Sequence, residues 1–301
     1  GFDCASSSEI RHVLSLGVRP ERIIFASPCK DYDQIHYARV GGVRKTVFDS
    51  ESELLKLSRC HPEAELYLRI WADDPQCSVR LGQKFGAPVE YGRYLLQRAE
   101  ALKVNVVGLC FHVGSSASDP SAYARAIAHA RVIYDAATQR GFHIHSIDVG
   151  GGFTSTNLTE VSHALRHAME QHFGSILPTI RWMAEPGRLF VQDAFTLACR
   201  VLGTRRVRPD QPVDVYINDS IYKNFLNALA EPPIPEPLLL TGQSNADDGL
   251  NEAVANGLPR QLLYTVWGQT CCGLDRIRAD CRFPCPVQVD DWILFPNMGG
   301  E

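Results

Sequence analysis

Two adjacent cysteines, Cys271 and Cys272, lie in the stretch WGQTCCGLDR at residues 267–276. Neighbouring thiols could bind a metal, form a disulfide, supply a nucleophile, or be two small buried side chains. The chain has ten cysteines, and its other close spacing, CRFPC at residues 281–285, has no companion pair or histidine cluster nearby. In a chain of this length without a signal peptide, we expect free thiols and no structural zinc site.

Three consecutive glycines, Gly150, Gly151 and Gly152, follow an apolar run in DVGGGF. Backbone amides without side chains can surround a phosphate, although three glycines alone more often mark a tight strand-to-helix turn. The next apolar run ends in AEPGR, which adds Glu185 and Arg188. Arginine binds phosphate through paired N–H donors, and a carboxylate beside it could hold a protonated ring nitrogen. Together, the two motifs predict a phosphorylated heteroaromatic cofactor.

A histidine and a serine in CFHVGSS, residues 110–116, fit the same cofactor. His112 taken alone could be a core histidine. Because it accompanies the other two motifs, we expect its ring to stack on the cofactor and Ser115 to contact the phosphate.

A repeating order of elements over residues 1–187 can position these groups. Short apolar runs alternate with segments of helical periodicity, and this alternation predicts a parallel sheet. The expected strands lie in residues 1–6, 22–27, 45–50, 65–70, 104–113, 143–151 and 180–187. The expected helices span residues 6–16, 51–59, 89–102, 120–140 and 159–173. Seven such units predict a (β/α)8 TIM-like barrel, over residues 1–190, whose first β/α unit is absent.

Polar side chains stand at the ends of five expected strands. In a barrel, residues at the carboxyl ends of the strands face the active site. We therefore expect the following residues to converge: Asp3, Arg69, His112, Asp148 and Glu185.

Residues 191–301 show a different pattern, in which strand-like runs are separated by turns. The expected strands are residues 194–207, 213–219, 261–268 and 283–296. Residues 231–260, rich in Pro, Gly, Asn and Asp, predict a long loop. We expect an all-β C-terminal domain.

The composition is that of a globular protein, with 45% hydrophobic residues, 21% charged residues and a net charge of −4. A net charge this small does not indicate a surface that binds nucleic acid or membrane. No apolar run approaches the roughly 20 residues of a membrane span. The N-terminal GFDCASSSEI lacks the basic and apolar regions of a signal peptide, so we expect a cytoplasmic protein.

Seven motifs, in order along the chain, resemble those of eukaryotic ornithine decarboxylases: GFDCAS, FHVGS, DVGGGF, AEPGR, YINDSIY, WGQTCCGLD and DWILFPNMG. Those enzymes belong to the fold-type III, group IV decarboxylases that depend on pyridoxal 5'-phosphate, and they are related to alanine racemase and arginine decarboxylase. The resemblance implies a cofactor-binding barrel, a C-terminal β-domain and a head-to-tail homodimer with active sites at the interface. It also implies decarboxylation of L-ornithine to putrescine, for polyamine or alkaloid-precursor synthesis.

The resemblance implies a role for each matching residue. Glu185 would keep the pyridine nitrogen protonated, His112 would stack on the ring, and Cys271 would reach across the dimer to direct protonation of the α-carbon. The phosphate would be bound by Ser115, Gly150, Gly151, Gly152 and Arg188. The lysine and ring region would be supported by Asp3, Glu9 and Arg80, with Tyr222 near the cofactor and substrate.

Four features depart from the family. The family's Schiff-base lysine precedes GFDCAS, and no lysine here has its sequence context, so we expect a fragment that is incomplete at both ends. Cys272 stands where the family has an aspartate that binds the distal ammonium of ornithine. Glu231 stands in place of a second such aspartate, and Glu301 replaces a tyrosine that contacts the phosphate.

These departures leave three functions open. The chain could be an ornithine decarboxylase, or a divergent paralogue that acts on a modified substrate in secondary metabolism. It could also be a non-catalytic regulator like the antizyme inhibitors, and an antizyme-like regulator is itself a possible partner. The retained cofactor residues favour an enzyme.

Overall fold

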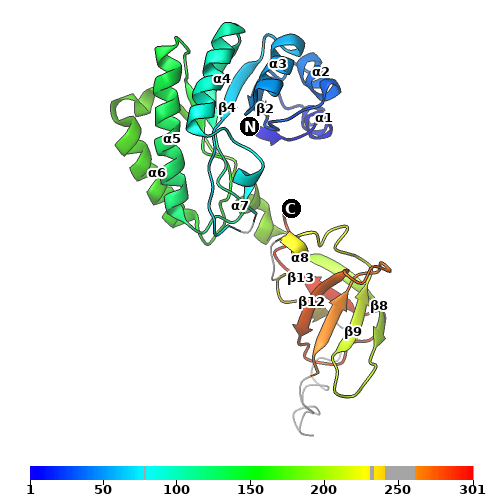
Figure 1. Cartoon of the computed structure of the whole chain (residues 1–301). Helices are drawn as coiled ribbons and strands as arrows, with labels where there is room; N and C mark the ends of the chain where they lie inside the picture. The colour runs from blue at the N-terminus through cyan, green and yellow to red at the C-terminus, as the bar shows by residue number, and fades with distance from the viewer. Residues whose placement is uncertain (78, 231–233, 241–261, 301) are drawn as a thin grey trace. The chain divides into compact units, whose positions relative to one another are not determined.

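The computed structural model describes residues 1–77, 79–230, 234–240 and 262–300. They form two compact units, one spanning Gly1–Gly187 and the other beginning at Arg188 (Figure 1). The sequence placed the boundary after residue 190. Within the described ranges, no helix is both long and apolar enough to cross a membrane.

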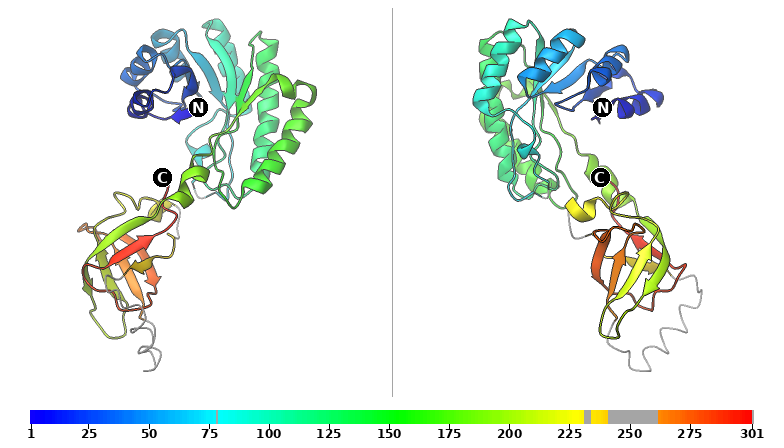
Figure 2. Two further views of the ribbon diagram at one scale, coloured as in Figure 1. Left: turned by 180° about the vertical axis from the view of Figure 1, so that it is seen from behind. Right: turned by 45° about the vertical axis from the view of Figure 1, so that its right-hand side comes forward.

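The first unit contains a curled sheet of seven parallel strands, paired in the order in which they occur along the chain (Figure 2). The strands are β1 (Phe2–Cys4), β2 (Ile23–Phe25), β3 (Lys45–Phe48), β4 (Glu65–Arg69), β5 (Asn105–Cys110), β6 (Ser146–Asp148) and β7 (Arg181–Met183). All seven lie in the apolar runs that predicted them. Most of the central strand residues are buried, as expected for a sheet that is covered by helices.

Helices on the outside of this sheet connect successive strands (Figure 1). They are α1 (Ser7–Ser15), α2 (Tyr32–Val40), α3 (Glu51–Cys60), α4 (Val89–Ala101), α5 (Pro120–Gln139) and α6 (Leu158–Phe173). Side chains cap two of these helices, because Ser50 accepts the Glu53 N–H and Asp119 accepts the Ser121 N–H. The sequence missed α2, in which only Ile35 and Ala38 are buried, too few for a clear apolar period.

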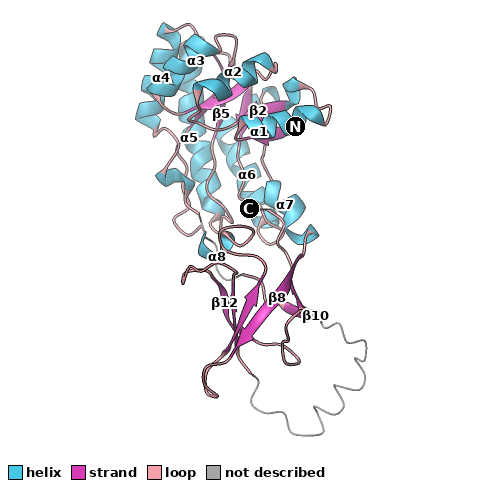
Figure 3. Cartoon of the chain, turned by 90° about the vertical axis from the view of Figure 1, so that its right-hand side faces the viewer, coloured by secondary structure: helices cyan, strands magenta, loops and turns pink. Residues whose placement is uncertain are grey.

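The second unit, whose strands β8, β10 and β12 are labelled in Figure 3, is built on a six-stranded sheet. The strand order is β10-β13-β8-β9-β11-β12. Its strands are β8 (Leu197–Arg205), β9 (Val213–Ile217), β10 (Leu238–Leu240), β11 (Tyr264–Trp267), β12 (Arg276–Cys281) and β13 (Trp292–Phe295). Neighbouring strands are antiparallel except β9 and β11, which are parallel. Two short α-helices accompany these strands: α7 (Gly187–Val191), which begins at the last residue of the first unit, and α8 (Asn227–Ala230).

Three expectations for the second unit need correction. Strand β12 was not predicted, because its sequence RIRADC is largely charged and only two of its residues are buried. Of the expected strand 283–296, only Trp292–Phe295 is extended and paired. Strand β10 lies within the segment expected to be a loop, and most of the rest of that segment lies outside the described residues.

A curled parallel sheet with helices between its strands, followed by a mostly antiparallel sheet, confirms the predicted fold class.

Candidate functional site

The polar residues at the strand ends of the first unit converge at one edge of the sheet. Asp3 lies in β1, while Arg69 and Asp148 are the last residues of β4 and β6. His112 and Glu185 each follow a strand by two residues. Because the strands are parallel, their carboxyl ends meet at the same edge, where barrel enzymes place their sites.

Three carboxyl groups at this edge have pKa values above their usual range. Burial, followed by the charge of Asp148, raises the pKa of Asp3 to about 6. Burial likewise raises the pKa of Asp148 to about 6. Burial and the charges of Asp148 and Asp3 hold the pKa of Glu185 well above its usual range, and the Asp3 and Glu185 side chains share a hydrogen bond. Protein atoms surround the Asp3 carboxyl, but the residue remains exposed to solvent.

One cation opposes these carboxyl groups. The charge of Arg69 lowers the pKa of both Asp3 and Glu185, but burial and mutual repulsion outweigh it. A cluster of this kind retains a proton near neutral pH. The cluster therefore suits a basic ring nitrogen. The nitrogen can take up that proton, which leaves a carboxylate paired with a positively charged ring.

His112 presents a neutral ring beside this cluster. Its Nδ1 accepts the Gly114 N–H at 3.1 Å. Burial, aided by the charge of Arg69, lowers the pKa of His112 to about 4, so the imidazole is uncharged at neutral pH. A Cβ at Gly151 would lie 2.7 Å from His112 Nε2, so a glycine at this position lets the ring approach the loop backbone.

The glycine-rich loop after β6 is held by side chains around it. The Gly150 N–H donates to Asp148 Oδ1 at 2.9 Å, and the Tyr123 hydroxyl donates to the Gly151 carbonyl at 2.8 Å. Asn157 Nδ2 donates to the Gly152 carbonyl at 2.9 Å. Gly150 and Gly152 have φ of +71° and +92°. A Cβ at Gly150 would lie 2.1 Å from the Phe111 carbonyl oxygen.

These contacts make the loop a tight turn and also a fixed backbone cradle. The turn alone accounts for two of the glycines, because other residues rarely adopt positive φ. The cradle, the neutral imidazole and the proton-retaining carboxyl groups together fit a phosphorylated pyridine. The residues present in the first unit therefore fit the cofactor that the sequence motifs predict.

Three other predicted residues have local partners. The Ser115 N–H donates to the Val79 carbonyl at 3.2 Å, which joins the loop after β5 to the segment before Arg80. Arg80 forms an ion pair with the buried Asp73. Glu9 accepts from the Ala5 N–H and the Ser6 hydroxyl at 2.7 and 2.9 Å, and its own N–H donates to Ser6 Oγ at 3.3 Å, so these bonds fix the start of α1.

The remaining predicted residues belong to the second unit or lie outside the described ranges. Arg188 lies in α7 and Cys271 is exposed. The Tyr222 hydroxyl donates to Cys272 Sγ at 3.0 Å. Glu231 and Glu301 lie outside the described residues.

Asp275 joins the two loops that carry Tyr222 and the cysteine pair. Its buried carboxylate accepts the Ile221 N–H at 2.9 Å and the Thr270 N–H at 3.0 Å. A Cβ at Gly268 would lie 2.3 Å from this carboxylate, so the loop approaches it closely. These bonds hold Tyr222 and Cys272 next to each other, although they are 50 positions apart in the sequence.

Sequence reasoning missed four positioning residues, Asp74, Tyr123, Asn157 and Asp275. Asp74 is fully buried and accepts the Ser118 and Asp119 N–H groups at 2.8 and 3.0 Å, which fixes the start of α5. Asn157 had a local signal, because it follows the glycine loop and precedes a helix. The other three each contact a residue that is far away in the sequence, so a local pattern does not reveal the contact.

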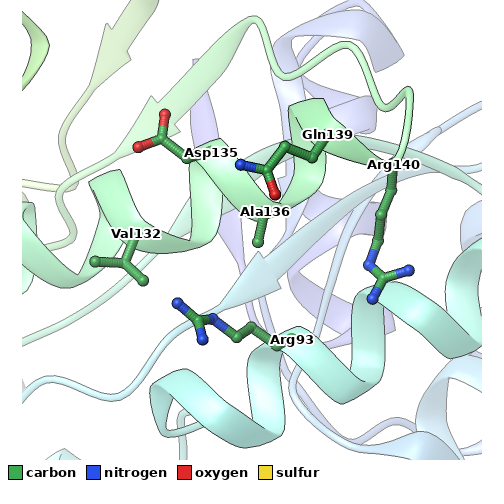
Figure 4. Close-up of a pocket in the computed structure, with 6 residues that line it drawn as sticks. All are labelled: Arg93, Val132, Asp135, Ala136, Gln139 and Arg140. Carbon is green, nitrogen blue, oxygen red and sulfur yellow. The ribbon is translucent and has the colours of Figure 1, made fainter.

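A separate hollow lies on the outer face of the first unit, between α4 and α5 (Figure 4). Its volume is about 640 Å³, and its lining consists of Arg93, Val132, Asp135, Ala136, Gln139 and Arg140. None of the strand-end residues contributes to it. Arg140 is already paired with Glu100 at 3.0 Å.

Comparison with known proteins gives consistent results. Residues 1–192 match the pyridoxal-binding domain of pyridoxal-dependent decarboxylases. Ornithine decarboxylase of Mus musculus is 40% identical over 99% of this chain and 66% of its own length. Antizyme inhibitor 2 of Xenopus laevis is 39% identical over the same shares.

The arginine decarboxylase of Paramecium bursaria Chlorella virus is similar in structure, with a TM-score of 0.88 at 37% identity. The alignment covers 99% of this chain and 77% of that one. The chain spans 66% of the length of the mouse protein, slightly less than two thirds.

Proposed function

The chain belongs to the family of pyridoxal-dependent decarboxylases, and from that premise we propose that it decarboxylates a basic amino acid with pyridoxal 5'-phosphate as cofactor. We take L-ornithine as the substrate and putrescine and CO2 as the products, in cytoplasmic polyamine synthesis. The observation that carries the proposal is the proton-retaining cluster of Asp3, Asp148 and Glu185.

The cofactor, when bound, supplies a ring that accepts negative charge from the substrate α-carbon. Glu185 holds a proton at the ring nitrogen, and the Asp3 side chain supports Glu185 through their shared hydrogen bond. The neutral His112 ring would hold the face of the cofactor without adding a competing charge. The backbone of Gly150–Gly152 would hold the phosphate, and Cys271 of the other subunit would supply a proton at the substrate α-carbon.

The test is release of CO2 by the full-length protein from ornithine, lysine and arginine. We expect release from ornithine, and Glu185→Gln should lower the rate by on the order of 100-fold or more, because an amide cannot keep the ring nitrogen protonated. Glu170→Gln, on the exposed face of α6, is the matched control and should leave the rate unchanged. Release from none of the three amino acids would refute the proposal.

Selection of ornithine requires a group that binds the distal ammonium. Cys272 carries no fixed charge to pair with a distal ammonium, and a charge-assisted hydrogen bond is worth about 1.5–3 kcal/mol. Cys272→Asp combined with Glu231→Asp should therefore raise kcat/KM for ornithine by about 10- to 100-fold. A gain supports a divergent paralogue whose natural substrate is a modified one, and no gain contradicts that alternative.

We also propose that the active form is a homodimer. Large apolar side chains are exposed in both loops of the Tyr222–Cys272 region, with Leu226 63%, Leu229 59% and Leu274 73% exposed. Light scattering on the full-length protein tests this. A monomer that binds no cofactor would instead favour a non-catalytic regulator.

A further inference from the structure

The cysteine pair of the second unit differs from the other thiols that the structure describes. Cys4, Cys77, Cys110, Cys199 and Cys281 are buried. Cys271 is exposed and Cys272 is partly exposed, and the two are consecutive in the chain. Cys29 and Cys285 are also exposed and Cys60 is partly exposed, but none of the three has a neighbouring cysteine.

A hydroxyl group points at one thiol of the pair. The Tyr222 hydroxyl donates to Cys272 Sγ at 3.0 Å, a good geometry for a sulfur acceptor. Asp275 fixes both loops through the Ile221 and Thr270 N–H groups, and the Gln269 N–H donates to the Asp219 carbonyl at 3.0 Å. These contacts to the backbone therefore hold the Tyr222 hydroxyl next to the Cys272 thiol.

The geometry points to a vicinal dithiol site, formed by Cys271 and Cys272 and assisted by Tyr222, that binds trivalent arsenicals and reacts first at Cys272. The binding chemistry involves the thiols alone, but Cys271 is also the residue to which the proposed function assigns protonation of the α-carbon, so the tests below measure thiol labelling and not activity.

The order of reaction follows from the surroundings of Cys272. A thiolate is the reactive form of cysteine, and a hydrogen bond to sulfur favours it. The Tyr222 hydroxyl, together with the Leu274 N–H, lowers the pKa of Cys272, while the charge of Asp275 acts in the opposite sense. Burial raises the pKa of the Cys285 thiol, so this exposed cysteine is a suitable comparison.

Adjacent position suits an arsenical better than a disulfide. Consecutive Cα atoms are about 3.8 Å apart, which is shorter than the usual range for a disulfide. An arsenic atom between the two sulfurs enlarges the ring and relieves this constraint. With phenylarsine oxide, two S–H bonds and the As=O bond break, two As–S bonds form, and one water leaves without any change of oxidation state.

The first experiment measures the order of thiol labelling. The full-length protein is treated with limiting iodoacetamide at a series of pH values, and each cysteine peptide is quantified by mass spectrometry. We expect Cys272 to be labelled before Cys285, with a profile displaced to lower pH. Tyr222→Phe should move the Cys272 profile to higher pH and slow labelling near neutral pH by roughly three- to tenfold. An unchanged Cys272 profile in that variant would overturn the role of Tyr222.

The second experiment measures arsenical binding. One equivalent of phenylarsine oxide should protect both Cys271 and Cys272 from labelling, and dithiothreitol should reverse the protection. Cys272→Ser and Cys271→Ser should each weaken binding by on the order of 100-fold, because the second thiol acts at high effective concentration. Cys285→Ser, the control, should change nothing. Equal binding by wild type and Cys272→Ser would refute the dithiol site.

Discussion

Asp148 is the carboxyl group at the strand ends that solvent does not reach, with 2% of its surface exposed. Burial raises its pKa to about 6, and the hydrogen bond from the Gly150 N–H opposes the shift. An unfolded aspartate titrates near 3.9. The folded chain therefore holds the proton of Asp148 more tightly than the unfolded chain does. Its contribution to stability is complete below about pH 4 and is lost as the pH rises through about 6.

Asp148→Asn should remove this pH dependence. The amide oxygen still accepts the Gly150 N–H, but the side chain cannot ionise. Relative to wild type, we expect the variant to gain about 1–3 kcal/mol in free energy of unfolding between about pH 4 and pH 7.5, measured by urea denaturation. Asp210→Asn, at an exposed position, should give no such difference. Parallel curves for Asp148→Asn and wild type would contradict the shifted pKa.

The residues of the candidate site could be recognised from the sequence, but many of the contacts between them could not. Asp3, His112, Asp148 and Glu185 stand at strand ends, and a strand end can be recognised from a local pattern. The hydrogen bond between Tyr222 and Cys272 joins residues 50 positions apart, so no local pattern contains it. Asp275 lies in the motif WGQTCCGLD, but the Ile221 N–H that it accepts is 54 positions away, so the motif does not reveal this contact.

At the level of elements, α3 is fastened to the sheet by a buried charge pair. Lys30 Nζ lies 2.9 Å from Glu53 Oε1, and both side chains are essentially inaccessible to solvent. Lys30 Nζ also donates to the carbonyls of Ser27 and Val47 at 2.8 and 2.7 Å. Burial lowers the pKa of Lys30 and the charge of Glu53 opposes this shift, so the pair depends on both partners.

Glu53→Gln should therefore be strongly destabilising. It leaves the buried ammonium of Lys30 without its counter-charge, and we expect a loss of about 3–5 kcal/mol in free energy of unfolding. The double variant Lys30→Met/Glu53→Leu should lose less, because the one charge that loses its partner is then Lys56, which also pairs with Glu53 at 2.7 Å but is 19% exposed. A double-mutant cycle from urea denaturation measures the coupling.

The matched control for this cycle is the exposed pair of Arg39 and Glu63, with both side chains 43% exposed. Glu63→Gln should cost less than about 1 kcal/mol. A loss at Glu53 as small as that at Glu63 would show that the buried pair does not fasten α3.

Elements were predictable where one face is clearly apolar. Each of the seven strands of the first unit is an apolar run, and α5 begins with a recognisable Asp119-Pro120 start. Helix α2 buries too few side chains to produce a period. Strand β12 buries only two of its six residues, so its pairing with β11 sets its conformation more than its own sequence does.

At the scale of the whole molecule, each unit has its own core. Ile147 on β6 is fully buried in the first unit, and Ile217 on β9 is fully buried in the second. Ile217 belongs to a cluster that also contains Val215, Val266 and Phe295, all from the second unit. Separate cores predict that damage to one unit leaves the other unchanged.

Ile147→Val and Ile217→Val test this independence, because each removes one methylene from a fully buried side chain. Each should cost about 0.5–1.5 kcal/mol in free energy of unfolding. In the double variant the two losses should add to within about 0.5 kcal/mol, since mutations without shared partners are independent. Calorimetry should show each single variant displacing a different part of the unfolding transition. Ile217→Val combined with Ile293→Val, both in the second core, is the comparison in which coupling is expected. Coupling between Ile147 and Ile217 as large as in that comparison would mean that the two units unfold as one.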